Sequence, residues 1–282
     1  MSGDTAPSRP GPSNLQQRVI SAIVLAAIVL ALTWAGGVWF RLLAVAIGAA
    51  IFYEWATMAG AVASIRHQVL GWLLVAAVLI ALALGIEARL LLGGAVAGAV
   101  VMWVHSRIAG EGGWLWIALP YATIPAVALA MLRGADIAGV WAILFLFAVV
   151  WATDILAYFV GRAVGGPKLA PSISPGKTWS GAVGGTLAGV VAGAVVAWFA
   201  APAIGMAGIA LTALALSVVG QAGDLYESGV KRRFGVKDSS HLIPGHGGVM
   251  DRVDALVAAA VALYVVGALA GSADMPAQGL FG

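Results

Sequence analysis

The feature that most constrains this chain is a series of apolar runs, each long enough to cross a lipid bilayer as a helix. Crossing the hydrocarbon core takes about 20 helical residues. Nine such spans are predicted, at residues 19–35, 38–58, 69–86, 90–105, 113–132, 137–160, 179–200, 203–222 and 252–270. The fourth is short and glycine-rich, so we expect it to be tilted, broken or buried inside the bundle, and eight spans are the second choice. The predicted fold class is an all-α, polytopic integral membrane protein.

Composition agrees with this class and narrows it. Of the residues, 62% are hydrophobic and 10% charged, whereas a soluble domain carries about 25% charged residues. A net charge of +3 is too small to indicate nucleic-acid binding, and the absence of Cys excludes disulfides, thiolate metal sites and a cysteine nucleophile. We predict a disordered cytoplasmic tail at 1–17, which is rich in Pro, Ser and Gly, N-terminal membrane helices at 18–135, and a catalytic membrane region at 136–282.

The basic residues predict the orientation. If the N-terminus is cytoplasmic and nine spans alternate, all 15 Lys and Arg residues lie inside except Arg41, Arg89 and Arg133. This asymmetry fulfils the positive-inside rule, and the opposite orientation would reverse it. Two long polar loops, 161–178 and 223–251, then face the cytoplasm. Richness in Ala, Gly and Val favours a bacterial source, so the expected location is the inner (plasma) membrane.

Acidic residues mark the helix ends beside these two loops. They are Asp154, Asp224, Asp251 and Asp254. Ionisable groups at such depth usually face the bundle interior or a water-filled cavity and are candidates for function. Asp154 shares one helical face with Tyr158 and Arg162, which follow it by four and eight residues. The alternative is that Tyr158 and Arg162 are interfacial anchors.

The segment SPGKTWSG at 174–181 opens the seventh span. It is not a phosphate-binding loop, because Pro171 stands where G-x-x-x-x-G-K-[ST] needs its first Gly and no strand precedes it. Lys177 and Thr178 still lie at a helix start, where free N–H groups favour an anion. A phosphate contact and a positive-inside lysine are both open for Lys177. Glycines at 181, 185, 189 and 193 then form a stripe for close helix packing, either within the chain or between two copies, which leaves a homodimer open.

The second loop carries most of the polar groups. If GDLYESGVKRR is helical, one polar stripe is formed by Asp224, Glu227, Ser228, Lys231 and Arg232. A solvated helix face has the same spacing. In IPGHGGVMDRVD, the glycines allow close backbone approach, and capping of the ninth helix explains only one of the two aspartates. Carboxylates beside many cations suit a polyphosphate ligand with a divalent metal, and hence phosphoryl or nucleotidyl transfer.

Residues 228–254 resemble the phosphatidate cytidylyltransferase (CDP-diacylglycerol synthase) family. The family pattern is S-x-hydrophobic-K-R-x₄-K-D-x-small-x₂-hydrophobic-P/G-x-H-G-G-hydrophobic-x-D-R-hydrophobic-D. The residues that meet it are Ser228, Val230, Lys231, Arg232, Lys237, Asp238, Ser240, Ile243, Pro244, His246, Gly247, Gly248, Val249, Asp251, Arg252, Val253 and Asp254. GDLYES, ATDILAY and SPGKTWSG extend the resemblance, although most relatives have Lys and Glu where Gly176 and Ser180 stand.

The resemblance implies transfer of a cytidylyl group from CTP to phosphatidate in the bilayer, giving CDP-diacylglycerol and pyrophosphate. It implies Mg²⁺ as cofactor, with a second, monovalent cation left open, and Asp224 and Asp251 as metal ligands. The catalytic set it implies is Asp224, Asp251, Lys231, Arg232, Lys237 and Arg252. The implied substrate-binding set is Lys177, Thr178, Ser174, Ser228, Asp154, Asp238, His246, Gly247, Gly248 and Asp254.

Two other functions compete with this interpretation. CDP-alcohol phosphotransferases also use aspartates with Mg²⁺ in membranes, and the spacing of Gly248, Asp251 and Asp254 fits part of their pattern. The D-G-x₂-A-R that begins the pattern is missing. A transporter with a cytoplasmic polar vestibule would show repeats and charges near the midplane, whereas these charges cluster at one face.

Overall fold

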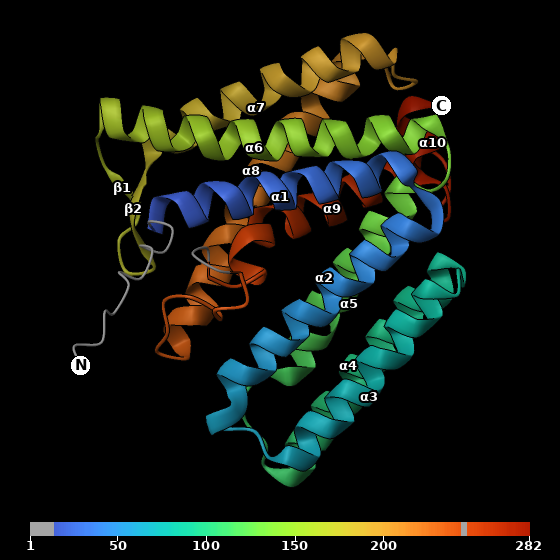
Figure 1. Ribbon diagram of the computed structural model, residues 1–282, viewed down its shortest axis with the longest axis vertical. Coiled ribbons are helices and arrows are strands. Elements are labelled where there is room, and N and C mark those ends of the chain that lie inside the picture. The colour runs from blue at the N-terminus through green and yellow to red at the C-terminus, as the bar shows by residue number, and fades with distance from the viewer. Residues whose placement is uncertain (1–13, 244–246) are drawn as a thin grey trace, which may run out of the picture.

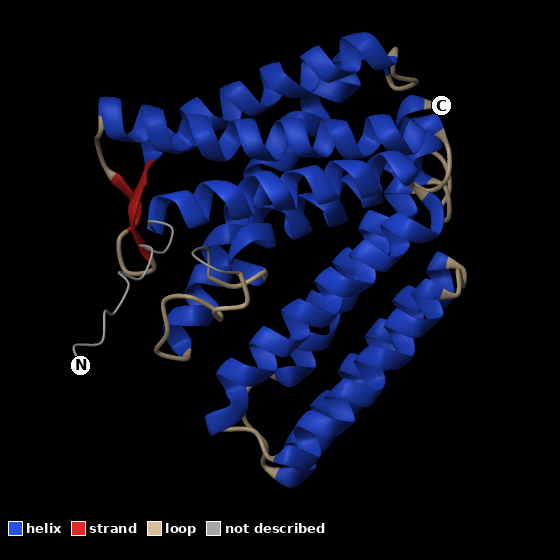
Figure 2. Cartoon of the chain, in the orientation of Figure 1, coloured by secondary structure: helices blue, strands red, loops and turns tan. Residues whose placement is uncertain are grey.

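The computed structural model of the chain describes residues 14–243 and 247–282. Ten α-helices, one 3₁₀ turn and two short strands are formed in these residues (Figures 1 and 2). The first five helices are α1 (Asn14–Ala35), α2 (Gly37–Met58), α3 (Ile65–Ala83), α4 (Ala88–Ala109) and α5 (Leu115–Arg133), with the 3₁₀ turn η1 (Ala59–Ala61) after α2. The others are α6 (Ile137–Val164), α7 (Trp179–Ala200), α8 (Gly205–Arg233), α9 (Met250–Ala270) and α10 (Pro276–Phe281).

Eight of the described helices, α2 to α9, are long and apolar enough to cross a membrane. The predicted all-α, polytopic membrane fold is thereby confirmed. The ninth span and the orientation stay predictions, since the apolar helix described within α1 is the shorter segment Ser21–Ala35. Helix α1 begins inside the predicted tail at 1–17, and the rest of that tail lies outside the described residues.

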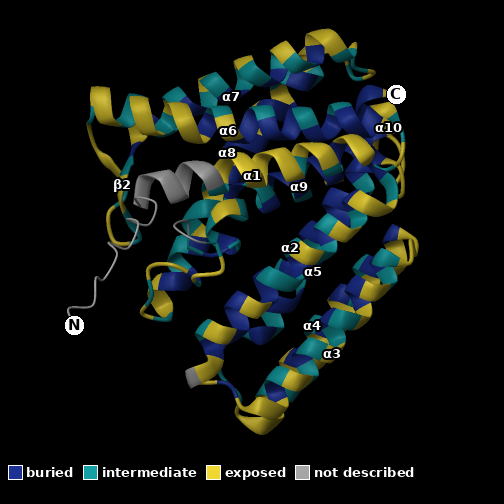
Figure 3. Cartoon of the chain, viewed as in Figure 1, coloured by how far each residue is buried: buried dark blue, intermediate teal, exposed yellow. Residues whose placement is uncertain are grey.

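For the fourth span, the alternatives of a broken or a buried helix are wrong, whereas the alternative of a tilted helix stays a prediction. Helix α4 is continuous over 22 residues, and only 28% of its most apolar window is buried. The glycines of α4 do not interrupt the helix. A Cβ at Gly98 would lie close to Leu119, so this glycine allows close packing, whereas a Cβ at Gly93 would meet no other atom. Figure 3 shows a mixture of exposed, intermediate and buried residues along α3 and α4, while α5 is the most buried of the eight spans, at 67% of its window.

The two polar loops are more ordered than the sequence predicts. The first contains an antiparallel hairpin of β1 (Lys168–Ala170) and β2 (Ser174–Thr178), which hydropathy gives no reason to expect. In the second, α8 continues as a helix to Arg233, so the described residues of this loop outside the helices are 234–243 and 247–249. Figure 1 shows the hairpin at one end of the bundle and α10, with the C-terminus, at the other.

The glycine stripe of α7 packs within the chain, against α6. A Cβ at Gly189 would lie 2.3 Å from the Thr153 hydroxyl oxygen, and one at Gly185 would lie 2.5 Å from the Thr153 carbonyl oxygen. Only glycine lets the two helices approach this closely. Because this contact occupies the stripe, the stripe no longer argues for a homodimer.

Candidate functional site

A cavity of about 910 Å³ lies at the hairpin end of the bundle. Its walls come from the end of α6, both strands of the hairpin, the start of α7, the middle of α8 and the first turns of α9. The charged residues that line it are Asp154, Arg162, Lys168, Lys177, Asp224, Asp251, Arg252 and Asp254. Segments far apart in sequence thus place four carboxylates and four cations around one space.

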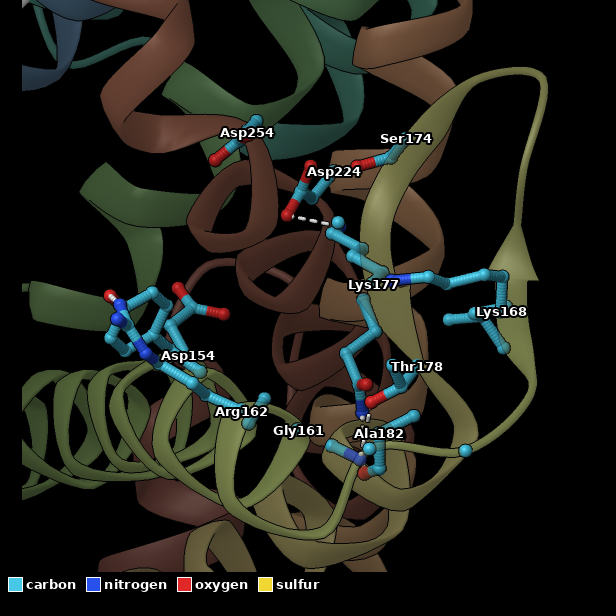
Figure 4. Close-up of a pocket in the computed structure, with 18 of the residues that line it drawn as sticks. Asp154, Gly161, Arg162, Lys168, Ser174, Lys177, Thr178, Ala182, Asp224 and Asp254 are labelled. Atoms are coloured by element: carbon cyan, nitrogen blue, oxygen red, sulfur yellow. Dashed lines mark hydrogen bonds and ion pairs between the residues drawn. The ribbon is translucent and has the colours of Figure 1, made fainter.

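Lys177 crosses the cavity to reach α8. Its ammonium forms an ion pair with the Asp224 carboxylate, drawn as a dashed line in Figure 4. Both side chains stay partly exposed, although the Lys177 ammonium nitrogen itself is buried. The Asp224 carboxylate also accepts a long hydrogen bond of 3.4 Å from the Ser228 hydroxyl. Lys177 therefore contacts another site residue, Asp224. A lysine that only set the orientation of the protein in the membrane would not need this contact.

Thr178 has a structural role at the same place. Its hydroxyl accepts a hydrogen bond from the Gly181 N–H at 3.1 Å and so caps the start of α7. At this helix start, the Gly181 N–H is therefore already bonded within the chain, and it is not free for the anion that the sequence predicts there. Ser174, also predicted, lines the cavity from the other end of β2.

The predicted common face of Asp154, Tyr158 and Arg162 is confirmed. All three line the cavity, and an Arg162 guanidinium nitrogen donates a hydrogen bond of 2.9 Å to the Tyr158 hydroxyl. Figure 4 shows Asp154 and Arg162 together on the wall facing Lys177. The pair brings a cation to the cavity from α6, and Arg162 is a site residue that the motifs do not include.

Three carboxylates face one another in the cavity. Asp154 on α6 and Asp254 on α9 are each close enough to Asp224 on α8 to experience like-charge repulsion. Such a cluster is stabilised by cations, and Lys177 supplies one of them through its pair with Asp224. A metal ion bound with phosphates would add further positive charge in this part of the cavity.

Asp251 lines the cavity but is mostly engaged by its own segment. Its side chain is 6% exposed and accepts hydrogen bonds from Lys231 Nζ at 2.6 Å and from two N–H groups, those of Ser239 at 2.9 Å and Gly248 at 2.8 Å. Lys231 in turn pairs with the buried Glu227 at 2.7 Å. The predicted Asp251 and Lys231 are thus brought together, but in a buried network beside the cavity.

Several predicted site residues do not line the cavity. These are Ser228, Lys231, Arg232, Lys237, Asp238, Gly247 and Gly248. Arg232 is exposed and donates a hydrogen bond of 2.9 Å to the Val236 carbonyl oxygen, and Lys237 and Asp238 are also exposed. His246 lies outside the described residues.

The two departures from the family pattern differ in consequence. Gly176 lines the cavity, and a Cβ at this position would have no other atom within 4 Å, so a longer side chain would fit there. Ser180 is used internally: its hydroxyl donates to the Gly165 carbonyl oxygen and lies 3.1 Å from the Thr178 hydroxyl. The serine thereby ties the start of α7 to the end of α6.

Sequence reasoning misses further residues. Lys168 and Gln221 line the cavity, but an isolated lysine in a polar loop and a glutamine in an apolar span form no motif. Glu54 on α2 contacts the segment that leads into α9. Its signal is present, because an acidic residue inside an apolar span is a candidate for function on that ground alone.

The fold and the site define an integral membrane protein with a cavity of mixed charge suited to a phosphate-bearing ligand. The sequence model described as "Cytidylyltransferase family" matches residues 16–270, and the chain belongs to this family. It is 51% identical to the phosphatidate cytidylyltransferase of Brucella suis, over 95% of this chain and 99% of the relative. For the enzyme of the same name from Pseudomonas aeruginosa the identity is 36%, over 87% and 94% of the two chains. The resemblance predicted from residues 228–254 is confirmed.

Proposed function

We propose that this chain transfers a cytidylyl group from CTP to phosphatidate, giving CDP-diacylglycerol and pyrophosphate. The observation that carries the proposal is the Lys177–Asp224 pair, set among further cations and carboxylates in a cavity at one end of a membrane bundle. The bundle gives a lipid phosphate access from the bilayer, and the polar end gives a nucleotide access from water. The bacterial relatives carry the name of this activity.

The cavity residues would hold two anionic reactants against their mutual repulsion. Arg162, Lys168, Lys177 and Arg252 reach the space from three sides and would neutralise phosphate oxygens. An oxygen of the phosphatidate phosphate then attacks the α-phosphorus of CTP, the bond from that phosphorus to the β-phosphate oxygen breaks, and pyrophosphate leaves with the electron pair. The protein mainly positions groups and offsets charge in such a transfer.

Mg²⁺ is part of the proposal because the carboxylates fit it. The ion usually takes one or two protein carboxylates together with phosphate oxygens and water. Among the described residues, no three or more His, Asp or Glu side chains are grouped so that they could hold a metal ion by themselves, so phosphate oxygens and water would have to supply most of its ligands. Asp224 would hold the ion together with phosphate oxygens, in place of its present pairing with Lys177, and the bound ion would neutralise phosphate charge. Asp251, predicted as the second ligand, fits less well because Lys231, Ser239 and Gly248 already occupy its oxygens.

The location is part of the same proposal. We place the hairpin end of the bundle at the cytoplasmic face of the inner membrane, where CTP is available. The basic residues Lys168 and Lys177 lie at that end, as the positive-inside rule requires. Because the chain has no Cys, a single Cys introduced in the hairpin or at the exposed Leu242 can be labelled from one side of intact cells. Labelling from outside would contradict this orientation.

Pyrophosphate release by the purified protein in detergent tests the function. We expect release from CTP and Mg²⁺ only when phosphatidate is added, with an equal amount of CDP-diacylglycerol formed. A CDP-alcohol phosphotransferase would release no pyrophosphate, and a transporter would release none under any condition. Release that is independent of phosphatidate would overturn the proposal.

The direct route of transfer has a separate test. If the lipid phosphate attacks CTP without a cytidylyl-enzyme intermediate, labelled pyrophosphate cannot enter CTP in the absence of phosphatidate. Exchange under those conditions would reveal a covalent intermediate.

A further inference from the structure

Glu54 is a buried acid in the half of the chain that the family motifs do not cover. It lies near the end of α2, and its exposed fraction is 0%. Burying a carboxylate inside a membrane bundle costs stability unless hydrogen bonds or charges compensate it. The partners of Glu54 therefore indicate why the chain keeps it.

All four hydrogen bonds to Glu54 come from one segment of the opposite half. Oε1 accepts from the Val249 N–H and the Ser240 hydroxyl, both at 2.7 Å. Oε2 accepts from the Met250 N–H at 2.7 Å and the Ser239 hydroxyl at 2.9 Å. The partners lie 185 to 196 positions further along the chain. Four donors match the acceptor capacity of a carboxylate.

Two of these bonds cap helix α9. The N–H groups of Val249 and Met250 stand at the start of α9, where backbone donors have no intrahelical partner. The residue at the N-cap position, Val249, has no side chain that could bond them. A carboxylate at this place also interacts favourably with the positive end of the helix dipole. Glu54 thus supplies from α2 the cap that the sequence of α9 lacks.

One of the other two bonds, from Ser239, leads to a residue that lines the cavity. The Ser239 hydroxyl that contacts Glu54 also lies 3.0 Å from Asp251 Oδ2, so one side chain separates Glu54 from a cavity residue. Gly248 completes the contact: a Cβ there would lie 1.9 Å from the Ser239 hydroxyl oxygen and 2.7 Å from both Glu54 oxygens. The motif glycine at 248 is therefore explained by packing against Glu54 and Ser239.

We propose that Glu54 is a positioning residue for the transfer reaction. It does not line the cavity, and it acts by fixing Ser239, Ser240, Val249 and Met250, and with them the first turn of α9. That turn carries Asp251, Arg252 and Asp254 into the site. The activity readout rests on the proposed function, whereas the order of the segment can be measured without it.

Glu54→Gln is the variant that tests this role, because it keeps size and shape. Each Glu54 oxygen accepts one backbone N–H, so either orientation of the amide places an NH₂ group against an N–H donor. We expect turnover to fall by roughly tenfold to a hundredfold, as for a misplacement of about 1 Å, while KM for CTP changes less. Glu87→Gln is the matched control, since its side chain is 61% exposed and lies outside the cavity.

A second readout reports the segment itself. Leu242 is 48% exposed, and Leu242→Cys gives the Cys-free chain a single thiol next to Ser240. We expect a water-soluble maleimide to label this thiol several times faster with Glu54→Gln than with Glu87→Gln. If Glu54→Gln does not fold, Ser240→Ala removes one of the four donors and should raise labelling by a smaller factor.

The outcomes separate the two proposals. Equal labelling rates and equal turnover in folded Glu54→Gln and Glu87→Gln proteins would overturn the positioning role. If wild-type protein made no CDP-diacylglycerol while labelling still rose with Glu54→Gln, the proposed function would fail and the structural link would stand.

Discussion

The two halves of the molecule differ in whether they line the large cavity: the C-terminal half does, and the N-terminal half does not. Every residue that lines the large cavity belongs to α6, the hairpin and the turn before it, α7, α8 or α9. The N-terminal half, α1 to α5, contains the most buried span, α5. This helix packs against α2 and α4 of its own half and against α9 of the other half. Yet the apolar half is not passive, because the buried Glu54 on α2 holds the segment that carries Asp251. Motifs therefore identify the half that lines the cavity and overlook the contact that Glu54 makes from the other half.

The largest expected effect comes from Asp224 in the catalytic half. Asp224→Asn keeps the shape of the side chain and removes the charge that pairs with Lys177 and suits Mg²⁺. We expect turnover to fall by about 10²–10³, the scale for losing one electrostatic contribution in a preorganised site. The unfolding temperature in detergent should stay near wild type, because Asp224 is partly exposed. Near-normal turnover with unchanged Mg²⁺ dependence would move the metal site elsewhere.

Lys231 and Arg232 are neighbours in sequence, but we expect a large loss of stability from replacing Lys231 and almost none from replacing Arg232. Lys231→Met would leave Glu227 and Asp251 as buried charges without their cation. Breaking a buried ion pair from one side costs about 3–5 kcal/mol. Arg232→Met alters an exposed residue, so we expect a change within about 0.5 kcal/mol. Denaturant unfolding in detergent measures both, and equal values would show that the Lys231 network adds no stability.

A site residue could be predicted from the sequence only when it belonged to a local pattern. Asp154, Lys177 and Asp224 could be placed at one end of the bundle because each lies beside a polar loop, and the structure brings them together. The direction of Arg232 could not be predicted, since spacing along α8 does not fix where the chain turns after Arg233. Glu54 depends on a contact between distant segments, which no local pattern contains.

The fold shows the same limit. Hydropathy predicts the apolar helices because the bilayer imposes their length. It cannot predict the hairpin at 168–178, whose pairing is short and lies outside the spans. Nor does it show that the glycines of α7 face α6, because a stripe of small residues carries no information about its partner.

Glycines in the two halves should respond differently to a larger side chain. Gly189→Leu would drive a side chain into Thr153 and Val149 of α6, and overpacking of this kind costs typically 1–3 kcal/mol or more. Gly93→Leu on α4 meets open space, so a change within about 0.5 kcal/mol is expected. Unfolding temperatures in one detergent allow the comparison. If both variants were equally destabilised, the close contact of α6 with α7 would be wrong.

The smallest effect is expected from restoring the family residue at 176. Gly176→Lys places a further cation at the cavity, where the structure has room for it. An exposed pairing of this kind contributes about 0.2–1 kcal/mol, which corresponds to a decrease in KM for CTP of roughly 1.4- to 5-fold. High salt should remove the gain. Ser172→Lys, in the same hairpin but outside the cavity, should leave KM unchanged.

Protection of a single thiol by CTP tests most directly whether the cavity is the nucleotide site. Gly176→Cys places a thiol in the cavity of a Cys-free chain, and Ser172→Cys places one outside it in the same hairpin. We predict that CTP with Mg²⁺ slows labelling at position 176 in proportion to its saturation and has no effect at position 172. The account would be contradicted if CTP supported turnover while leaving the labelling rate at 176 unchanged, because the nucleotide would then bind somewhere else.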